Sequence, residues 1–355
     1  MSTVHVIVPD SIDDPTRPSG GNRYDRRICD ELAACGWLVH EHAMPGDWHT
    51  PDCVARRALA SVLAALADGA VVLIDGLIAS AATDLPAFAQ RLRLVVLVHM
   101  PLAQGPDDRP ETRAVERAAL SAATALVTTS TWTKNWLTGH YALEPDRIQI
   151  VEPGTDAAEL APGTSGGGEL LCVASVTPAK GHDVLVAALA AIRDLPWSCV
   201  CTGSVDRDPE FVDRLRRSAV AGGIGHRIRF VGIRTGADLE ATYAAADLVV
   251  VCSRAETYGM VVTEALSRGI PVIAGAVGGV PDALGYGADL LRPGILVTPD
   301  DPPALAAALR RWLTEAELRR RLRQAAGQRR DTVLRWAVPA SRLSDILTSV
   351  AATCR

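Results

Sequence analysis

The sequence lacks a basic excess and long apolar runs. Its 355 residues include 36 Lys and Arg against 41 Asp and Glu, a formal net charge of -5. Proteins that bind nucleic acid or anionic membranes need a basic excess or a basic face. No run approaches the ~20 apolar residues of a membrane span, and the start, MSTVHVIVPD, predicts a strand rather than a signal peptide. We therefore expect a cytoplasmic protein with no nucleic-acid partner and no stable membrane insertion.

Cysteine motifs for metal binding are missing as well, although eight cysteines are present. None forms a Cys-x-x-Cys pair, and several lie inside apolar runs such as LLCVASV and VVVCSR. This placement favours reduced thiols in the core over a disulfide or zinc framework. The thiols expected to be reduced and buried are Cys29, Cys35, Cys53, Cys172, Cys199, Cys201, Cys252 and Cys354.

The dinucleotide-binding fingerprint Gly-x-Gly-x-x-Gly follows no predicted strand, which disfavours an NAD-dependent dehydrogenase. What is present is the composition of a folded α/β protein, with 48% hydrophobic and 22% charged residues. A chain of this length suits two domains of ordinary size rather than one.

Short apolar runs, rich in β-branched residues, alternate with helical patterns in both halves of the chain. Such runs predict parallel sheets covered by helices on both faces, and therefore two doubly wound units in tandem. The flexible composition of ELAPGTSGGG predicts a linker between them. We predict a Rossmann-like domain over residues 1–160, a linker over 161–168 and a second Rossmann-like domain over 169–335. The predicted strands are 4–8, 38–43, 70–74, 94–99, 125–129, 148–152, 169–176, 197–203, 228–232, 248–253, 271–274 and 295–297.

Polar groups follow two strands of the first half. Ser19, Gly20 and Gly21 open a helix, where glycine amides can approach an anion closely, or where Ser19 simply caps a tight turn. His99 closes the fourth run, where it can donate to a phosphate or a sugar hydroxyl, or be a structural histidine satisfied by backbone. Ligands of doubly wound sheets bind beyond the carboxyl ends of the strands, so a cleft between the domains is the expected site.

The second half repeats this arrangement. Lys180 stands just before a helix, where it adds positive charge to an anion site or is a solvated surface lysine. Glu256 and Glu264 flank the start of another helix, with Gly259 and Met260 in its first turn. Two acids there can be partners of the helix dipole. An interaction with the helix dipole explains one of the two glutamates. It does not explain both of them together with a lysine at an anion site and two glycine turns.

This set of motifs resembles family 4 of the retaining glycosyltransferases, whose GT-B fold has two Rossmann-like domains facing across a cleft. The most specific part is the Glu, seven residues, Glu signature, present here as ETYGMVVTE from Glu256 to Glu264. The resemblance covers nearly the whole chain, and it implies that the last helix, here in segment 336–355, crosses back to the first domain. The supporting motifs are PSGGNRYDRRICDELAACGW, VHMPL, PAKGHDVLVAAL, RIRFVGI and YAAADLVVVCS.

The resemblance implies a role in donor binding for each matching position. Glu264 would bond the ribose of a nucleotide sugar, Glu256 would bond the sugar hydroxyls, and Lys180 would neutralise the diphosphate. His99 would bond the sugar near the reacting centre, so His99, Glu256 and Lys180 are the expected catalytic residues. The other expected donor-binding positions are Gly20 and Gly21 at the diphosphate, Tyr258, Gly259 and Met260 at sugar and phosphate, Gly232 and Ile233 at the base, and Ser175.

Two positions need a separate explanation. Ser175 stands where members of the family commonly carry a phosphate-binding arginine, for which Arg207 or Arg234 would have to substitute. Asp206 and Asp208 imitate the Asp-x-Asp metal site of a different transferase fold. Asp208, which precedes a proline, is more simply a helix N-cap.

The resemblance implies a metal-independent reaction without a cofactor, in which a hexose-type sugar is moved from a nucleotide, most often UDP in this family. Helices such as PDCVARRALASVLAALADG carry few cations for a membrane surface, so we expect a soluble small-molecule acceptor. Two alternatives remain open: a non-catalytic protein that binds nucleotide sugars, and a sugar phosphorylase or epimerase of the same fold.

Overall fold

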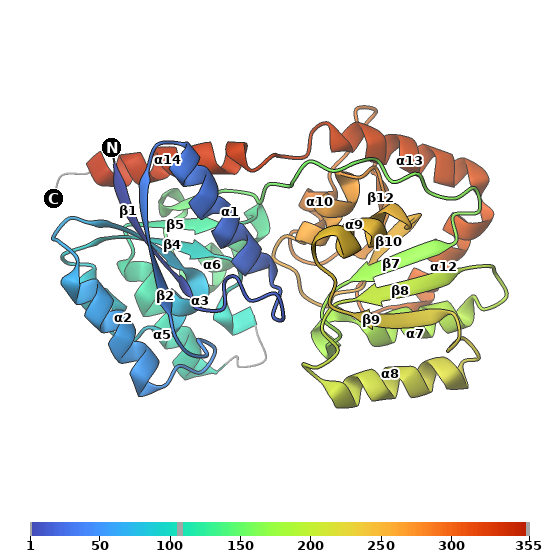
Figure 1. The fold of residues 1–355 in the computed structure, drawn as a ribbon, viewed down its shortest axis with the longest axis horizontal. Coiled ribbons are helices and arrows are strands. Elements are labelled where there is room, and N and C mark those ends of the chain that lie inside the picture. Colours follow the sequence, from blue (N-terminus) through green and yellow to red (C-terminus); the bar gives the residue numbers. More distant parts are fainter. Residues whose placement is uncertain (1, 105–108, 353–355) are drawn as a thin grey trace. The chain divides into compact units, whose positions relative to one another are not determined.

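The computed structural model describes residues 2–104 and 109–352 and divides into two α/β units (Figure 1). Unit 1 comprises residues 1–154 and 334–355, and unit 2 comprises residues 155–333. Each unit contains one six-stranded sheet in which all paired strands are parallel, as predicted. The domain boundaries predicted at residues 160 and 169 remain predictions.

Unit 1 has the strand order β2-β1-β3-β4-β5-β6. On one face of the sheet, Ile7, Val72 and Leu94 pack with side chains of α2, α3, α5 and α6. Helix α14 lies along α1 and against β3 and β4 (Figure 1). The elements are β1 (Thr3–Pro9), α1 (Gly20–Ala34), β2 (Leu38–Met44), α2 (Cys53–Ala65), β3 (Val71–Asp75), α3 (Gly76–Ala81), α4 (Leu85–Phe88), β4 (Arg93–Val98), η1 (Leu102–Gln104), α5 (Pro110–Ala122), β5 (Ala125–Thr128), α6 (Thr131–Tyr141), η2 (Pro145–Arg147), β6 (Ile148–Ile150) and α14 (Ala337–Ala352).

Unit 2 has the strand order β12-β11-β10-β7-β8-β9. Along β7, Leu170 and Cys172 pack with α7, α8 and α12, whereas Leu171 packs with α10 and α11 on the opposite face. The elements are β7 (Glu169–Val173), η3 (Pro178–Lys180), α7 (His182–Ala191), β8 (Ser198–Thr202), α8 (Pro209–Ala221), β9 (Ile228–Gly232), α9 (Gly236–Ala244), β10 (Leu248–Val251), α10 (Met260–Leu266), β11 (Val272–Gly275), α11 (Val280–Leu284), β12 (Gly294–Val297), α12 (Pro302–Thr314) and α13 (Ala316–Arg330).

All twelve predicted strands are present, but several end earlier than predicted. The strands predicted to reach residues 152, 176 and 253 end at Ile150, Val173 and Val251. Burial continues past each end, because the loops that leave these strands are themselves packed against the core. Apolar pattern alone therefore overestimates the length of a strand that runs into a buried loop.

The prediction for the cysteines was wrong at two positions. Cys35 and Cys53 are exposed, because they lie at a helix end and a helix start rather than inside a strand. Cys354 lies outside the described residues. The other thiols are buried as expected, and all seven described cysteines are free.

The predicted linker segment is anchored along unit 2. The amide of Ala161 donates to the carbonyl of Arg268 at 3.0 Å. The Thr164 hydroxyl donates to the buried carboxylate of Asp247 at 2.6 Å, and Arg323 pairs with the same carboxylate at 2.7 Å. A glycine-rich composition thus coexists here with specific hydrogen bonds.

Candidate functional site

The order of the strands marks one position in each sheet where ligand binding is expected. In unit 1, β1 lies between β2 and β3, and in unit 2, β7 lies between β8 and β10. The connections that leave such a pair of neighbouring strands diverge, and doubly wound sheets bind ligands at this switch point. Of the predicted site residues, Gly20 and Gly21 follow β1, Lys180 follows β7 and Glu256 follows β10, whereas His99 follows β4, the next strand beyond β3.

At the switch point of unit 1, three side chains from separate segments meet. Asp25 lies in α1, Asp75 ends β3 and His99 follows β4. The Nε2 atom of His99 lies 2.7 Å from Oδ1 of Asp25 and 3.6 Å from Oδ2 of Asp75. Both carboxylates are buried, and no described residue forms a hydrogen bond with Oδ2 of Asp25. Two carboxylates therefore share one imidazole.

Burial and mutual repulsion change the proton affinity of this cluster. Burial, followed by the negative charge of Asp25, raises the pKa of Asp75 to about 7, against a smaller lowering by His99. Burial alone would lower the pKa of His99, but the charges of Asp25 and Asp75 and the hydrogen bond to Asp25 together raise it. The surroundings of His99 therefore favour the protonated imidazole.

Among the described residues, these three are the one group whose ligand atoms lie close enough to share a metal ion, all within 4.8 Å of one another. Two ligands of one tetrahedral ion, each about 2.1 Å from it, would lie about 3.4 Å apart. The 2.7 Å between Nε2 of His99 and Oδ1 of Asp25 is instead the length of a charge-assisted hydrogen bond. We interpret the cluster as an ion-paired group.

The start of α1 lies against the His99 ring. Ser19 caps the helix as predicted, because its hydroxyl accepts from the amide of Asn22 at 3.1 Å. A Cβ at Gly21 would lie 3.2 Å from Cδ2 of His99, so a larger residue would press on the ring. Tyr24 packs edge-on against the same ring, with centroids 5.1 Å apart. The glycine turn and His99, predicted separately, are thus neighbours.

Asp25 and Asp75 are not among the site residues predicted from the sequence. Asp25 lies on the buried face of α1, between Tyr24 and Ile28, and Asp75 ends a strand that is buried throughout. Burying a carboxylate is costly unless it is paired. A carboxylate inside an otherwise apolar pattern is therefore the signal that would have found both.

At the switch point of unit 2, the lysine and the first glutamate of the predicted site are paired. Lys180 follows β7 and Glu256 follows β10, and Nζ lies 2.5 Å from Oε1 of Glu256. The Ser253 hydroxyl donates to the same oxygen at 2.8 Å. Gly181 turns the chain into α7 with a φ of +67°, and a Cβ there would lie 2.0 Å from the carbonyl oxygen of Cys252. Lys180 is therefore held at the strand end rather than free at the surface.

Glu264 has different partners. Gly259, predicted in the first turn of α10, instead caps the helix in a left-handed conformation with φ +91°, and Met260 is the first helical residue. Glu264 is buried and accepts from the hydroxyl of Tyr243 at 2.8 Å. Arg268 stacks over the Tyr243 ring and donates to the carbonyl of Glu264 at 2.7 Å. The two glutamates of the signature are thus fixed by separate sets of neighbours.

The positions predicted to hold the base lie at the end of β9. Gly232 has a φ of +74°, and its carbonyl accepts from the amide of Gly203 and the hydroxyl of Thr202, both at 2.9 Å. Ile233 is half-buried in the segment that follows. The backbone of this turn is therefore tied to β8, while its φ requires glycine.

Ser175 is half-buried, and neither cation proposed to replace an arginine there is bonded to it. Arg207 is exposed, and Arg234 donates to the hydroxyl of Thr242 at 2.7 Å. Asp208 caps α8 by accepting from the amide of Phe211 at 2.9 Å, which confirms the N-cap interpretation.

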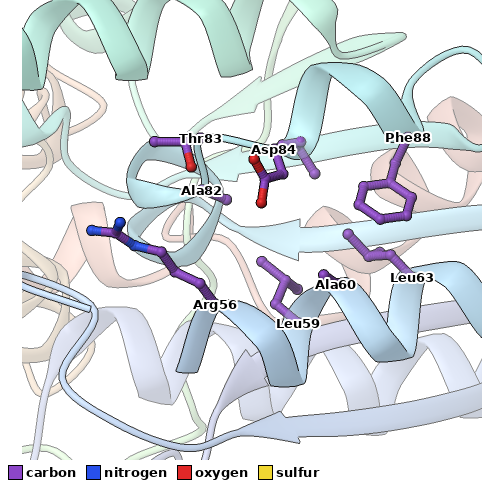
Figure 2. Close-up of a pocket in the computed structure, with 9 residues that line it drawn as sticks. Arg56, Leu59, Ala60, Leu63, Ala82, Thr83, Asp84 and Phe88 are labelled. Atoms are coloured by element: carbon purple, nitrogen blue, oxygen red, sulfur yellow. The ribbon is translucent and has the colours of Figure 1, made fainter. Parts of the chain in front are cut away.

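Two of the cavities in the described structure are lined by none of the predicted site residues. Figure 2 shows side chains of α2 facing the segment around α4, where the cavity volume of about 10 Å³ suits one water molecule. A larger cavity in unit 2, about 560 Å³, lies beside α9 and is lined in part by Arg268 and Arg330. Separately, no helix in residues 2–104 and 109–352 combines the length and apolarity needed to cross a membrane.

Comparison with known proteins identifies the family. A model described as glycosyltransferase family 4 matches residues 4–159, and one described as glycosyl transferases group 1 matches residues 164–329. The chain belongs to this group 1/family 4 of glycosyltransferases.

The chain is similar to D-inositol 3-phosphate glycosyltransferases. The protein of Corynebacterium glutamicum is 34% identical over 228 residues, which are 59% of this chain and 53% of that protein. The protein of Salinispora tropica is 33% identical over 270 residues, 69% of this chain and 55% of that protein. The chain thus spans about half the length of these relatives.

Solved structures with the same architecture include sucrose-phosphate synthase from Thermosynechococcus elongatus, with a TM-score of 0.82, 22% identity and coverage of 99% of this chain and 100% of that one. The Anabaena protein HepE, solved with UDP-glucose, has a TM-score of 0.78 and 17% identity and covers 98% of this chain and 100% of its own. These likenesses show the fold, which is GT-B, as the sequence predicted.

Proposed function

We propose that this chain is a retaining glycosyltransferase that moves a hexose-type sugar from a nucleoside-diphosphate sugar to a hydroxyl or another nucleophile of a small-molecule acceptor. The observation that carries the proposal is the Lys180–Glu256 pair at the switch point of unit 2, with Nζ 2.5 Å from Oε1. A diphosphate leaving group needs a cation, and a sugar needs a hydrogen-bond acceptor. The Lys180–Glu256 pair supplies both groups at one edge of the sheet.

Lys180 would stabilise the charge that develops on the leaving diphosphate. Its ammonium group has three N–H donors, so it can keep Glu256 and still bind a phosphate oxygen. The backbone amides of Tyr258, Gly259 and Met260 would add fixed donors for sugar and phosphate. Preorganised donors of this kind stabilise the transition state more than the ground state.

Glu256 would orient the donor sugar rather than attack it. Its Oε1 already accepts from Lys180 and Ser253, so the carboxylate is held in place by two donors. A front-face attack by the acceptor, guided by the departing phosphate, would retain the anomeric configuration. Glu264, held by Tyr243, would bind the ribose, and the Gly232 turn would bind the base.

UDP is the nucleotide we propose, because the structurally similar Anabaena protein was solved with UDP-glucose. The similar D-inositol 3-phosphate glycosyltransferases have, by their name, a small polar acceptor. That supports an acceptor of the same kind here.

A thermal-shift panel of UDP, GDP, ADP and dTDP sugars tests the donor. A ligand that binds only the native state raises the melting midpoint in proportion to the logarithm of its concentration over Kd. We expect a UDP sugar to raise the midpoint most. Equal or absent shifts with all four nucleotides would contradict the proposed site.

A further inference from the structure

The resemblance gives a role to His99 alone, yet His99 is one of three ionisable groups at the switch point of unit 1. Asp25 and Asp75 are 3% and 6% exposed, whereas the His99 side chain is 17% exposed. Two buried carboxyl groups thus surround one imidazole, and among the described residues Oδ2 of Asp25 has no hydrogen-bond partner. Such an arrangement costs stability, and perturbed buried groups of this kind cluster at functional sites.

The ring of His99 is fixed in one orientation. Its Nε2 atom faces Asp25, while Gly21 lies against the Cδ2 side and Tyr24 packs edge-on. The other nitrogen, Nδ1, lies on the opposite edge from Cδ2, and no described residue bonds it. The exposed part of the side chain is thus available to a ligand through Nδ1.

The state of Nδ1 depends on the carboxylates. In a neutral imidazole whose Nε2–H is bonded to Asp25, Nδ1 carries no proton and can only accept. When the ring is protonated, Nδ1–H donates. Among the described residues, Asp25 at 2.7 Å and Asp75 at 3.6 Å both favour the protonated ring.

We propose that Asp25 and Asp75 are positioning residues that hold His99 protonated and oriented, so that Nδ1–H donates to a hydroxyl or phosphate oxygen of the sugar donor. The identity of that ligand rests on the proposed function, whereas the role of Asp25 and Asp75 toward His99 is independent of it. Asp25 is the stronger partner because it bonds Nε2 directly. Asp75 contributes charge from a greater distance and also caps α3 through the amides of Leu77 and Ile78.

The test is NMR of histidine labelled with 15N and 13C in the full-length protein, with the His99 signals assigned by their loss in His99→Asn. We expect His99 to titrate above the ordinary value of 6.5 in the wild type, and below its wild-type value in Asp25→Asn. A smaller fall is expected in Asp75→Asn. The matched control is Glu116→Gln, which alters a buried carboxylate of the same unit that bonds Tyr141 and the amides of Leu102 and Ala103.

The kinetic arm uses the donor identified by thermal shift. We expect Asp25→Asn to lower kcat about 10- to 100-fold, as for other partners that orient a functional imidazole, with donor affinity changed less than threefold and the pH optimum moved to lower pH. An unchanged His99 titration in Asp25→Asn, or one changed equally by Glu116→Gln, would overturn the proposal. If His99 titrates as expected in every variant but the protein shows no transferase activity, only the proposed function is contradicted.

Discussion

The two units have the same kind of sheet but opposite chemistry at their switch points. Unit 1 places two buried carboxylates around an imidazole, whereas unit 2 places a lysine, a glutamate and a serine hydroxyl on neighbouring strand ends. In both units the strand order determines where the side chains meet. The residues in the connecting segments then determine the charge at each switch point. In unit 2 the lysine provides a cation that suits a diphosphate, whereas in unit 1 the carboxylates polarise the imidazole.

The outer strands differ as well. One strand, β2, lies beyond β1 in unit 1, whereas two strands, β8 and β9, lie beyond β7 in unit 2. The additional outer strand, β9, carries the Gly232 turn that we propose for the nucleotide base. The described part of unit 1 has no corresponding strand. We therefore propose that the nucleotide binds unit 2.

The largest effect is expected from Lys180→Met, which removes the cation of the unit 2 site. Losing one preorganised donor to a developing charge typically costs about 100- to 1,000-fold in kcat, and we expect a loss of that size in steady-state kinetics. The control is Lys134→Met in α6, since Lys134 is the chain's other lysine. If Lys134→Met lowered kcat as much as Lys180→Met, the effect would not be specific to the site in unit 2.

Gly181→Ala tests whether the turn before α7 holds the site together. The added Cβ would meet a backbone carbonyl at 2.0 Å in a left-handed conformation, so we expect ~2–4 kcal/mol less stability in urea unfolding. Gly327→Ala is the matched control within unit 2. It lies in α13 with nothing within 4 Å of the new Cβ, and it should stabilise the protein by about 0.5–1 kcal/mol. Destabilisation by both would point to a general intolerance of alanine.

Substitutions of the two glutamates of the signature should separate an effect on donor binding from an effect on kcat. Glu264→Ala removes the proposed ribose acceptor, and a lost hydrogen bond to a charged group costs ~1.5–3 kcal/mol, or about 10- to 150-fold in donor Kd. Calorimetric titration with the donor measures this effect.

Glu256→Gln keeps the shape of the side chain but loses its charge beside Lys180. We expect kcat to fall about tenfold or more while donor Kd changes little, because Glu256 would act mainly on the oriented sugar. If Glu256→Gln weakened binding and Glu264→Ala spared it, the two assignments would have to be exchanged.

Further effects concern pH, and they should run in opposite directions for the Asp75–His99 cluster of unit 1 and the Asp183–Arg254 pair of unit 2. The pKa of Asp75 is raised from 3.8 to about 7, so the native state binds this proton more tightly and unit 1 loses stability as pH rises from about 4 to 7. The raised pKa of His99 acts in the same direction, because its contribution is complete below 6.5 and is lost as pH rises through the folded value. Asp75→Asn should flatten this profile.

In unit 2, burial alone would raise the pKa of Asp183, but the ion pair with Arg254 lowers it below 3.8. Its contribution is present above that value and is lost as pH falls through the folded pKa. Hydrogen exchange followed by mass spectrometry reports the two units separately. A parallel response to pH of the peptides that contain Asp75 and those that contain Asp183 would contradict these electrostatics.

Much of this organisation could be predicted from the sequence. The twelve strands follow from apolar periodicity, and the caps at Ser19 and Asp208 follow from local chemistry that depends on a few adjacent residues. What local pattern cannot supply is which distant side chains meet. Lys180 and Glu256 were both expected at the site, but their direct pairing depends on β7 and β10 being neighbours.

The cluster around His99 shows the same limit more strongly. Asp25 and His99 are separated by 74 residues, and their contact requires both the strand order of unit 1 and the helical register of α1. Asp25 falls on an apolar helical face, where periodicity predicts a hydrophobic residue. The prediction that Cys35 and Cys53 are buried was wrong for a related reason, because composition does not show where a helix begins or ends.

The most direct measurement is to incubate the protein with the UDP sugar that gives the largest thermal shift and a set of small polyol and polyol-phosphate acceptors. Nucleotide release and the anomeric configuration of the product would be followed by NMR. We expect acceptor-dependent release of UDP, matched by an equal amount of a glycoside with the anomeric configuration of the donor. Tight donor binding without release, release that needs no acceptor, or an inverted product would contradict it.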